Sequence, residues 1–144
     1  MKQLATTIIL SLIGAFLITS FSLPENKPRN GISFFKGSWN EALLKAKTEK
    51  KYIFLDIYAS WCGPCKKLKK TTFKDKEVGE YYNKNFINVS IDGESKEGLI
   101  LANKYQVTSY PTLLVVDHNG VRKTKATGFM EPRILVNFGR RIVP

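Results

Sequence analysis

The segment YIFLDIYASWCGPC, residues 52–65, constrains the fold most strongly. Its first seven residues are apolar on both faces of a β-strand, with the single exception of Asp56. A strand of this kind lies in the interior of a sheet that helices cover on both sides. The segment therefore predicts an α/β fold with a central strand over residues 52–58.

The remaining elements follow from apolar periodicity and turn signals. Ser38 and Glu41 match a capping box, which predicts a helix start, and Asn119-Gly120 predicts a hairpin turn. The order of elements predicts a mixed β-sheet with helices on both faces. Helices are expected after Ser38, at 64–72, 76–83 and 97–104 and from Pro132 onward, and strands at 32–35, 52–58, 86–92, 112–117 and 121–127. The last helix is expected to bury Ile134, Leu135, Phe138 and Ile142.

The N-terminal 22 residues differ from the rest of the chain. They hold one charge, at Lys2, and then an apolar run, and small residues precede a candidate cleavage site before Leu23. This pattern is typical of a secretory signal peptide. An uncleaved membrane anchor is the alternative, because the run is about 18 residues long. Both interpretations predict a domain outside the cytoplasm, periplasmic or secreted.

The domain boundaries follow from composition. Residues 23–31 are polar and contain two prolines, so they are expected to form a linker, and residues 32–144 are expected to form one folded domain. The net charge of +11 suits attraction to anionic lipid or acidic partners. Nucleic-acid binding is disfavoured, because the basic residues are scattered and no recognition motif is present.

Cys62 and Cys65 are the only cysteines, and three roles are possible for them: a structural staple, a metal site or a redox pair. A structural staple is disfavoured, because closing so short a loop stabilises a fold little. A metal site is disfavoured, because structural zinc takes four ligands and His118, in the predicted turn, is the only histidine. A redox pair is favoured: Cys62 stands where a helix begins, which stabilises a thiolate, and Cys65 follows one turn later as the resolving thiol. Pro64 suits the first helical turn, and Gly63 allows close approach of another backbone.

Asp56 lies six residues before Cys62 on the predicted central strand. Its carboxyl is expected beneath the cysteine pair, where burial would raise its pKa and suit it to relay protons. A strand-end carboxylate that reaches solvent is the alternative. Pro111, at the start of a predicted strand, is permitted there, and the spacing does not indicate whether its peptide bond is cis.

Three groups of residues, in order, resemble the thioredoxin family: Asp56, the motif from Trp61 to Lys66, and Tyr110-Pro111-Thr112. The resemblance spans residues 39–141 and implies a thioredoxin fold. It implies a cis bond before Pro111, which packs against the cysteine pair, and a Tyr110 backbone that pairs with substrate. It implies that Asp56 assists deprotonation of Cys65. It implies that Trp61, Gly63, Pro64 and Gly128 shape the surface on which a substrate docks. Gly128 matches a glycine that lets partners dock closely, and a strand-end kink is its alternative role.

Residues 69–73 and 127–130 are closer to the C-terminal thioredoxin-like domain of the membrane reductase called disulfide bond protein D. Two positions depart from typical thioredoxins. Lys70 stands where they have a proline that kinks the active-site helix, and Asn88 stands where they have a lysine near the buried acid. Asp56 is therefore expected to lack that cationic neighbour.

These features predict an exported thiol-disulfide oxidoreductase that reduces protein disulfides through a mixed disulfide, with no cofactor other than the Cys62–Cys65 disulfide and no metal. An oxidising or isomerising enzyme and a binding module with idle cysteines are the alternatives. The expected partners are proteins with disulfides, a membrane protein is a candidate electron donor, and a monomer is expected. The lysines that follow the motif are expected to form a solvated helix face, with attraction of acidic partners as the alternative; they are Lys66, Lys67, Lys69 and Lys70.

Overall fold

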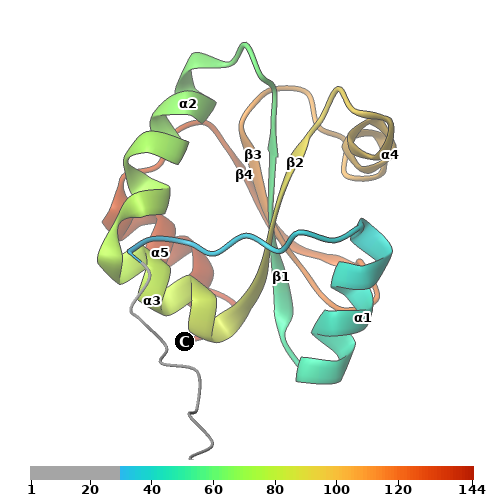
Figure 1. The fold of residues 1–144 in the computed structure, drawn as a ribbon, viewed down its shortest axis with the longest axis horizontal. Coiled ribbons are helices and arrows are strands. Elements are labelled where there is room, and N and C mark those ends of the chain that lie inside the picture. Colours follow the sequence, from blue (N-terminus) through green and yellow to red (C-terminus); the bar gives the residue numbers. More distant parts are fainter. Residues whose placement is uncertain (1–29) are drawn as a thin grey trace, which may run out of the picture.

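The computed structural model describes residues 30–144. The predicted signal peptide or anchor, residues 1–22, and most of the predicted linker lie outside the described residues. Within residues 30–144, no helix is both long and apolar enough to cross a membrane. The described chain forms one four-stranded sheet between two layers of helices (Figure 1).

The elements follow the order predicted from the sequence, with one strand fewer. The helices are α1 (Trp39–Glu49), α2 (Gly63–Lys70), the short 3₁₀ helix η1 (Thr72–Lys74), α3 (Lys76–Asn85), α4 (Lys96–Lys104) and α5 (Pro132–Arg140). The strands are β1 (Tyr52–Tyr58), β2 (Phe86–Asp92), β3 (Thr112–Val116) and β4 (Arg122–Thr127). The predicted capping box is confirmed, because the Ser38 side chain accepts from the Glu41 N–H and the Glu41 carboxylate accepts from the Ser38 N–H.

Strand β1 is central, as predicted. The strand order is β2-β1-β3-β4, with β1 parallel to β2 and antiparallel to β3. Strands β3 and β4 form the predicted hairpin, in which Gly120 has a positive φ of 72° that the turn requires. The mixed sheet predicted from the sequence is therefore confirmed.

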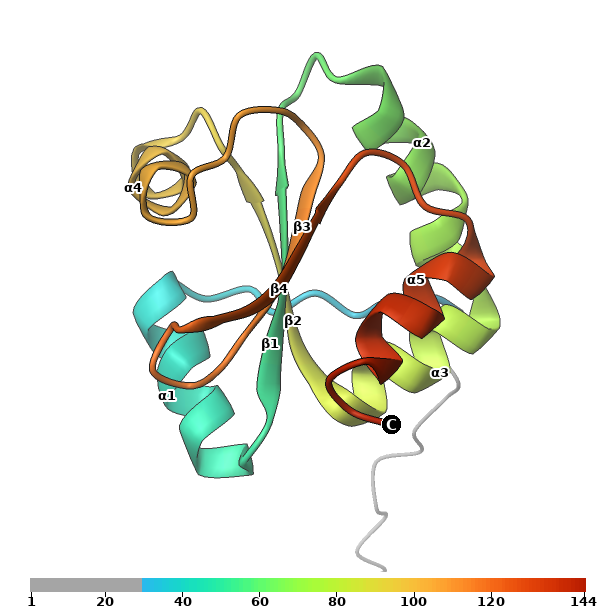
Figure 2. The same ribbon diagram turned by 180° about the vertical axis from the view of Figure 1, so that it is seen from behind.

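The two faces of the sheet carry separate cores. Helices α1 and α4 lie on one side, and helices α2, α3 and α5 lie on the other, as the front and rear views show (Figures 1 and 2). Ile53, Leu55 and Ile57 pack in the first core, and Phe54 packs in the second. Successive side chains of a strand point to opposite faces, so Asp56 points with Phe54 toward α2, α3 and α5.

The predicted strand at 32–35 is wrong. This segment crosses the edge of β2 without joining the sheet, and its one backbone bond to β2 is Phe35 N–H to Asn88 O, 2.8 Å. The main-chain groups of Ser33 bind side-chain amides instead: its N–H donates to Asn83 Oδ1 at 2.8 Å, and its carbonyl accepts from Asn88 Nδ2 at 3.4 Å. Side chains thus occupy the backbone groups that a strand would pair.

The apolar face predicted for the last helix is partly wrong. Leu135 and Phe138 are buried, as expected, but Ile134 is 55% exposed and Ile142 lies beyond the end of the helix. Val136 and Gly139 complete the buried face, which is rotated from the predicted one. Gly139 packs so closely on Tyr81 that a Cβ would lie 2.7 Å from its ring, so a larger residue would not fit on this side of α5.

Candidate active site

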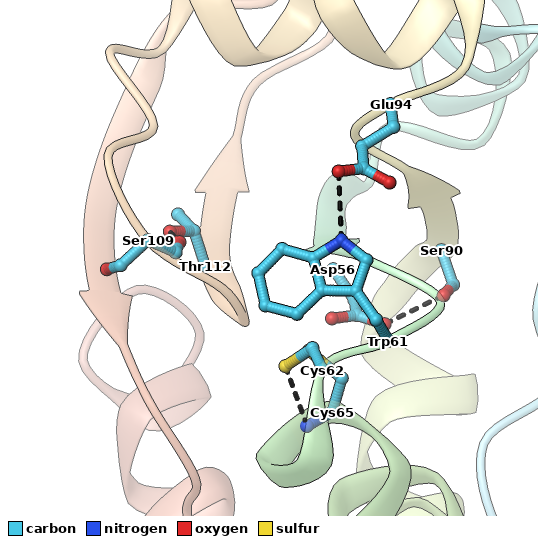
Figure 3. Close-up of a disulfide and its surroundings, with 8 residues drawn as sticks. All are labelled: Asp56, Trp61, Cys62, Cys65, Ser90, Glu94, Ser109 and Thr112. Carbon is cyan, nitrogen blue, oxygen red and sulfur yellow. Dashed lines mark hydrogen bonds between the residues drawn. A yellow bond between two sulfur atoms is a disulfide. The ribbon is translucent and has the colours of Figure 1, made fainter.

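Cys62 is the N-cap residue of α2, directly after the turn that follows β1. Its Sγ accepts a hydrogen bond from the Cys65 N–H at 3.2 Å, which satisfies one of the free donors of the first helical turn (Figure 3). Pro64 occupies the first turn, where its missing N–H costs nothing. A thiolate at Cys62 would be stabilised by this N–H and by the helix dipole.

Cys62 and Cys65 form a disulfide, with Cα atoms 5.3 Å apart. Both residues are nearly buried, 3% and 2% exposed, and they pack with Ala59, Tyr58 and Tyr110. The exposed Gly63 leaves open space where a Cβ would stand, so the surface beside the disulfide is free for the backbone of a partner.

Trp61 stands at the rim of the disulfide and is 66% exposed. Its indole N–H donates to Glu94 Oε1 at 2.9 Å, and its ring meets Tyr110 edge to face, with 6.1 Å between centroids. Glu94 lies in the loop between β2 and α4. Two contacts from distant parts of the chain therefore hold the orientation of an exposed aromatic side chain.

The Tyr110–Pro111 peptide bond is cis, as the resemblance implies. Pro111 precedes β3, and its carbonyl accepts a hydrogen bond from the Gly128 N–H at 2.8 Å. Gly128 has a φ of 90°, which a residue with a side chain adopts only under strain, and open space lies where its Cβ would stand. Tyr110 packs against the disulfide, and the hydrogen bond to Pro111 ties Gly128 to the residue that follows Tyr110.

Asp56 is buried, with 1% exposure, in the middle of the sheet. Its Oδ2 accepts one hydrogen bond, from Ser90 Oγ at 2.7 Å, and among the described residues its Oδ1 has no partner. Burial raises the pKa of Asp56 to about 6, against the opposing effects of the Ser90 hydrogen bond and the positive charge of Lys69. The carboxyl can therefore gain or lose a proton near neutral pH.

The neighbours of Asp56 differ in part from the expected ones. Asn88 lies opposite Phe54, and its side chain binds Asn83 and Ser33 rather than the acid. The residue opposite Asp56 is Ser90. Asp56 lacks the strand lysine, as expected, because Asn88 stands at that position. A different cation, Lys69 on α2, acts on the carboxyl electrostatically and was not expected there.

Three of the four lysines after the motif are exposed, as expected: Lys66, Lys67 and Lys70. Lys67 Nζ also lies 4.0 Å from the ring centroid of Phe129. Lys69 is the exception, because it is half-buried with its Nζ over the ring of Tyr58. Sequence reasoning missed Lys69, Ser90 and Glu94 as site residues. Ser90 is brought to the site by the register between β1 and β2, Glu94 by the loop after β2, and Lys69 by the packing of α2. No local sequence motif indicates any of these three placements.

Residues 30–144 contain no group of three or more His, Cys, Asp or Glu side chains that could hold a metal ion. His118 is exposed in the β3–β4 turn, far along the chain from the cysteine pair. The reactive groups that the structure places at this site are the Cys62–Cys65 disulfide and the buried carboxyl of Asp56.

The sheet order, the cysteine pair at the N-cap of α2 and the cis proline define a thioredoxin fold. The thioredoxin-like family model matches residues 35–118, so the chain belongs to the thioredoxin-like family of thiol-disulfide oxidoreductases. The thiol:disulfide interchange protein DsbD of Haemophilus influenzae is 30% identical over 130 residues. This match covers 87% of the present chain, which spans about a fifth of that relative, 22% of its length.

Solved structures support the same assignment. A candidate disulphide-isomerase from Bacteroides thetaiotaomicron is 38% identical, with a TM-score of 0.70 over 79% of this chain and 94% of that one. The oxidised C-terminal domain of DsbD from Neisseria meningitidis has a TM-score of 0.63 over 76% of this chain and 98% of that one. Because the two sequences are only 24% identical, this match supports the fold alone. The predicted fold and the resemblance to the DsbD domain are both confirmed.

Proposed function

We propose that this chain is an exported thiol-disulfide oxidoreductase that reduces disulfides in partner proteins. The observation that carries the proposal is a Cys62–Cys65 disulfide at the N-cap of α2, the helix that covers the face of the sheet where Asp56 is buried with a pKa of about 6 (Figure 1). The name of the relative DsbD, a thiol:disulfide interchange protein, supports exchange chemistry. The apolar N-terminal run of residues 1–22 supports export, by cleavage or as an anchor.

In the proposed reaction the reduced Cys62 thiolate attacks one sulfur of a partner disulfide. A mixed disulfide forms, and the other partner sulfur leaves as a thiolate that takes a proton from water. Asp56 then accepts the proton of Cys65, and the Cys65 sulfur attacks Cys62 Sγ. The mixed disulfide breaks, and the second partner sulfur leaves as a thiolate that takes a proton from water. Two electrons pass to the partner, and the Cys62–Cys65 disulfide remains.

The surface around the disulfide is proposed to bind the partner chain. The exposed Trp61 and the edges at Tyr110, Pro111 and Gly128 provide the surface on which a partner chain would dock. The Tyr110 backbone is proposed to pair with that chain in extended conformation. No cofactor is needed, because the electrons reside in the cysteine pair. A membrane protein that restores the dithiol is the proposed electron donor.

A Cys65→Ser variant tests the exchange proposal. This variant should accumulate mixed disulfides with partner proteins through Cys62, whereas Cys62→Ser should accumulate none, and the wild-type chain should reduce insulin with dithiothreitol as electron source. If neither trapping nor turnover occurs, the cysteines are idle and the chain is a binding module on the same fold.

The direction of electron flow needs its own measurement. Isomerisation is the second candidate, favoured by the 38% identity to the candidate disulphide-isomerase. A reductant requires a reduction potential near that of thioredoxin, roughly −270 mV, whereas a value near roughly −120 mV would indicate an oxidase. Restoration of activity to scrambled ribonuclease, without net reduction, would favour the isomerase.

A further inference from the structure

The buried carboxyl of Asp56 needs a route to exchange its proton with water, and Ser90 provides the connection. Ser90 Oγ donates to Asp56 at 2.7 Å from the neighbouring strand β2. The half-buried Ser90 also lines a cavity of about 450 Å³ that is open to solvent. Ser90 therefore contacts the acid and also borders a space that admits water.

Lys69 lines the same cavity as Ser90. It lies one helical turn after Cys65 on α2 and is half-buried, and its Nζ stands over the Tyr58 ring, 2.8 Å from the centroid. Tyr58 is two residues after Asp56 on β1, so both side chains point to the same face of the sheet. The ring thus holds the ammonium group on the face where the carboxyl is buried.

The other titratable groups around this cavity do not duplicate that charge. Lys74 lines it as an exposed side chain at the end of η1. Asp92 at the end of β2 raises the pKa of Lys69, as Asp56 does, and both act against burial, which lowers it. From β3 the residue opposite Asp56 is the apolar Leu113. Among residues 30–144, Lys69 is the cation that lowers the pKa of Asp56, against the larger effect of burial.

Resting on the proposed function, we propose that Lys69 is the positioning residue of the proton relay. From α2 it supplies the positive charge that favours the ionised carboxylate of Asp56. It also borders the cavity through which water exchanges the proton of that carboxyl. The charge comes from the same helix that carries Cys62 and Cys65. The side chain of Asn88, on β2, donates hydrogen bonds to Asn83 and Ser33 and supplies no charge to Asp56.

The relay step is the transfer of one proton. When a donor thiolate attacks Cys62 Sγ in the oxidised protein, the Cys62–Cys65 bond breaks and the electron pair goes to Cys65. The protonated Asp56 carboxyl gives its proton to that sulfur and becomes a carboxylate. Water in the cavity that Ser90 and Lys69 line returns a proton to Asp56, and Lys69 stabilises the carboxylate meanwhile.

The test is the titration of Asp56 in the oxidised protein, followed by carboxyl ¹³C NMR, in the variants Lys69→Met, Lys69→Arg and Lys70→Met. Methionine keeps the apolar stem over Tyr58 and removes the charge. We expect Lys69→Met to raise the titration midpoint of Asp56 by about one pH unit, Lys69→Arg to restore it, and Lys70→Met, exposed on the same helix, to leave it unchanged.

The rate at which a small thiol opens the Cys62–Cys65 disulfide gives a second readout. Expressed per thiolate of the attacking reagent, this rate should rise about fivefold at pH 7 in Lys69→Met, because about five times more Asp56 would then be protonated. It should stay at the wild-type value in Lys70→Met.

An Asp56 midpoint that is equal in wild type and Lys69→Met, or that moves equally in Lys70→Met, overturns the proposal. Circular dichroism checks that each variant is folded. The titration does not depend on turnover, so a chain in which Lys69 sets the midpoint but no partner disulfide is reduced refutes the proposed function and leaves the role of Lys69 in place.

Discussion

Strand β1 presents Ile53, Leu55 and Ile57 to helices α1 and α4, and on its other face it presents Phe54, Asp56 and Tyr58 to α2, α3 and α5. Leu55 and Asp56 are adjacent and equally inaccessible, at 0% and 1% exposure. The first face gains stability from apolar burial. The second buries a carboxyl that is held by one hydrogen bond, which costs stability, and it is the face next to the cysteine pair. The strand thus carries a structural core on one side and reaction chemistry on the other.

Leu55→Ala should give the largest loss of stability. Deleting a fully buried leucine side chain leaves a cavity in the α1/α4 core and should lower the free energy of unfolding by about 2–5 kcal/mol. Urea denaturation measures the loss. The insulin-reduction rate per folded molecule should be unchanged, because the side chain points away from the cysteines. A selective loss of rate in folded protein would contradict the division between the faces.

Asp56→Asn should have the opposite effect on stability. The folded-state pKa of about 6 lies above the ordinary value of 3.8, so the folded state binds the proton more tightly, and stability falls as pH rises from about 4 to about 6. One pKa unit corresponds to about 1.4 kcal/mol, so the variant should be about 3 kcal/mol more stable at pH 7. It should show little gain at pH 4.

Urea denaturation of Asp56→Asn at the two pH values checks this expectation, and the low-pH measurement is its internal control. Stabilisation of equal size at pH 4 and pH 7 would mean that ionisation of this carboxyl is not what costs the fold stability. Exchange should meanwhile slow, since general acid–base catalysis contributes about 10²-fold or more.

Ser90→Ala removes the one hydrogen bond that Asp56 accepts. Because this bond favours the ionised carboxyl, its loss should raise the pKa of Asp56 and lower stability at pH 7 by about 1.5–3 kcal/mol. The loss should be smaller at pH 4, where the carboxyl is protonated. Denaturation at both pH values measures it. Equal losses would assign Ser90 to packing alone.

Glu94→Ala should have the smallest effect on stability, less than about 0.5 kcal/mol, because Glu94 is exposed. It should free the Trp61 indole N–H, whose solvent exchange can be followed by NMR with the buried Trp39 as internal reference. Glu94→Gln keeps an acceptor and should retain protection. Unchanged exchange at Trp61 in Glu94→Ala would show that Tyr110 alone holds the ring.

Much of the fold follows from local patterns in the chain. The two-sided apolar run at 52–58 predicted the central strand, and Ser38 with Glu41 predicted the start of α1, because each depends on residues within a few positions. The prediction of a strand at 32–35 failed because Asn83 and Asn88, some fifty residues away, form hydrogen bonds with the backbone of this segment. Such a competition cannot be recognised from β-propensity.

The site divides in the same way. The positions of Cys62, Cys65 and Pro64 follow from one short motif, and the burial of Asp56 follows from its strand. The partners of Asp56 do not: Ser90 depends on the register between β1 and β2, and Lys69 depends on how α2 lies across β1. Typical thioredoxins have a lysine on the strand beside the buried acid, and Asn88 stands at that position here. The positive charge near Asp56 comes from Lys69 on helix α2 instead.

The central claim is that the buried carboxyl of Asp56 exchanges a proton with the cysteine pair. The most direct test is the rate at which a small thiol opens the Cys62–Cys65 disulfide, expressed per thiolate of that reagent, between pH 5 and pH 8 in wild type and Asp56→Asn. The protonated acid assists the leaving sulfur, so the wild-type rate should fall as pH rises, with a midpoint near 6. The variant should be slower at pH 5 and show no such step. Identical profiles in the two proteins would contradict the claim.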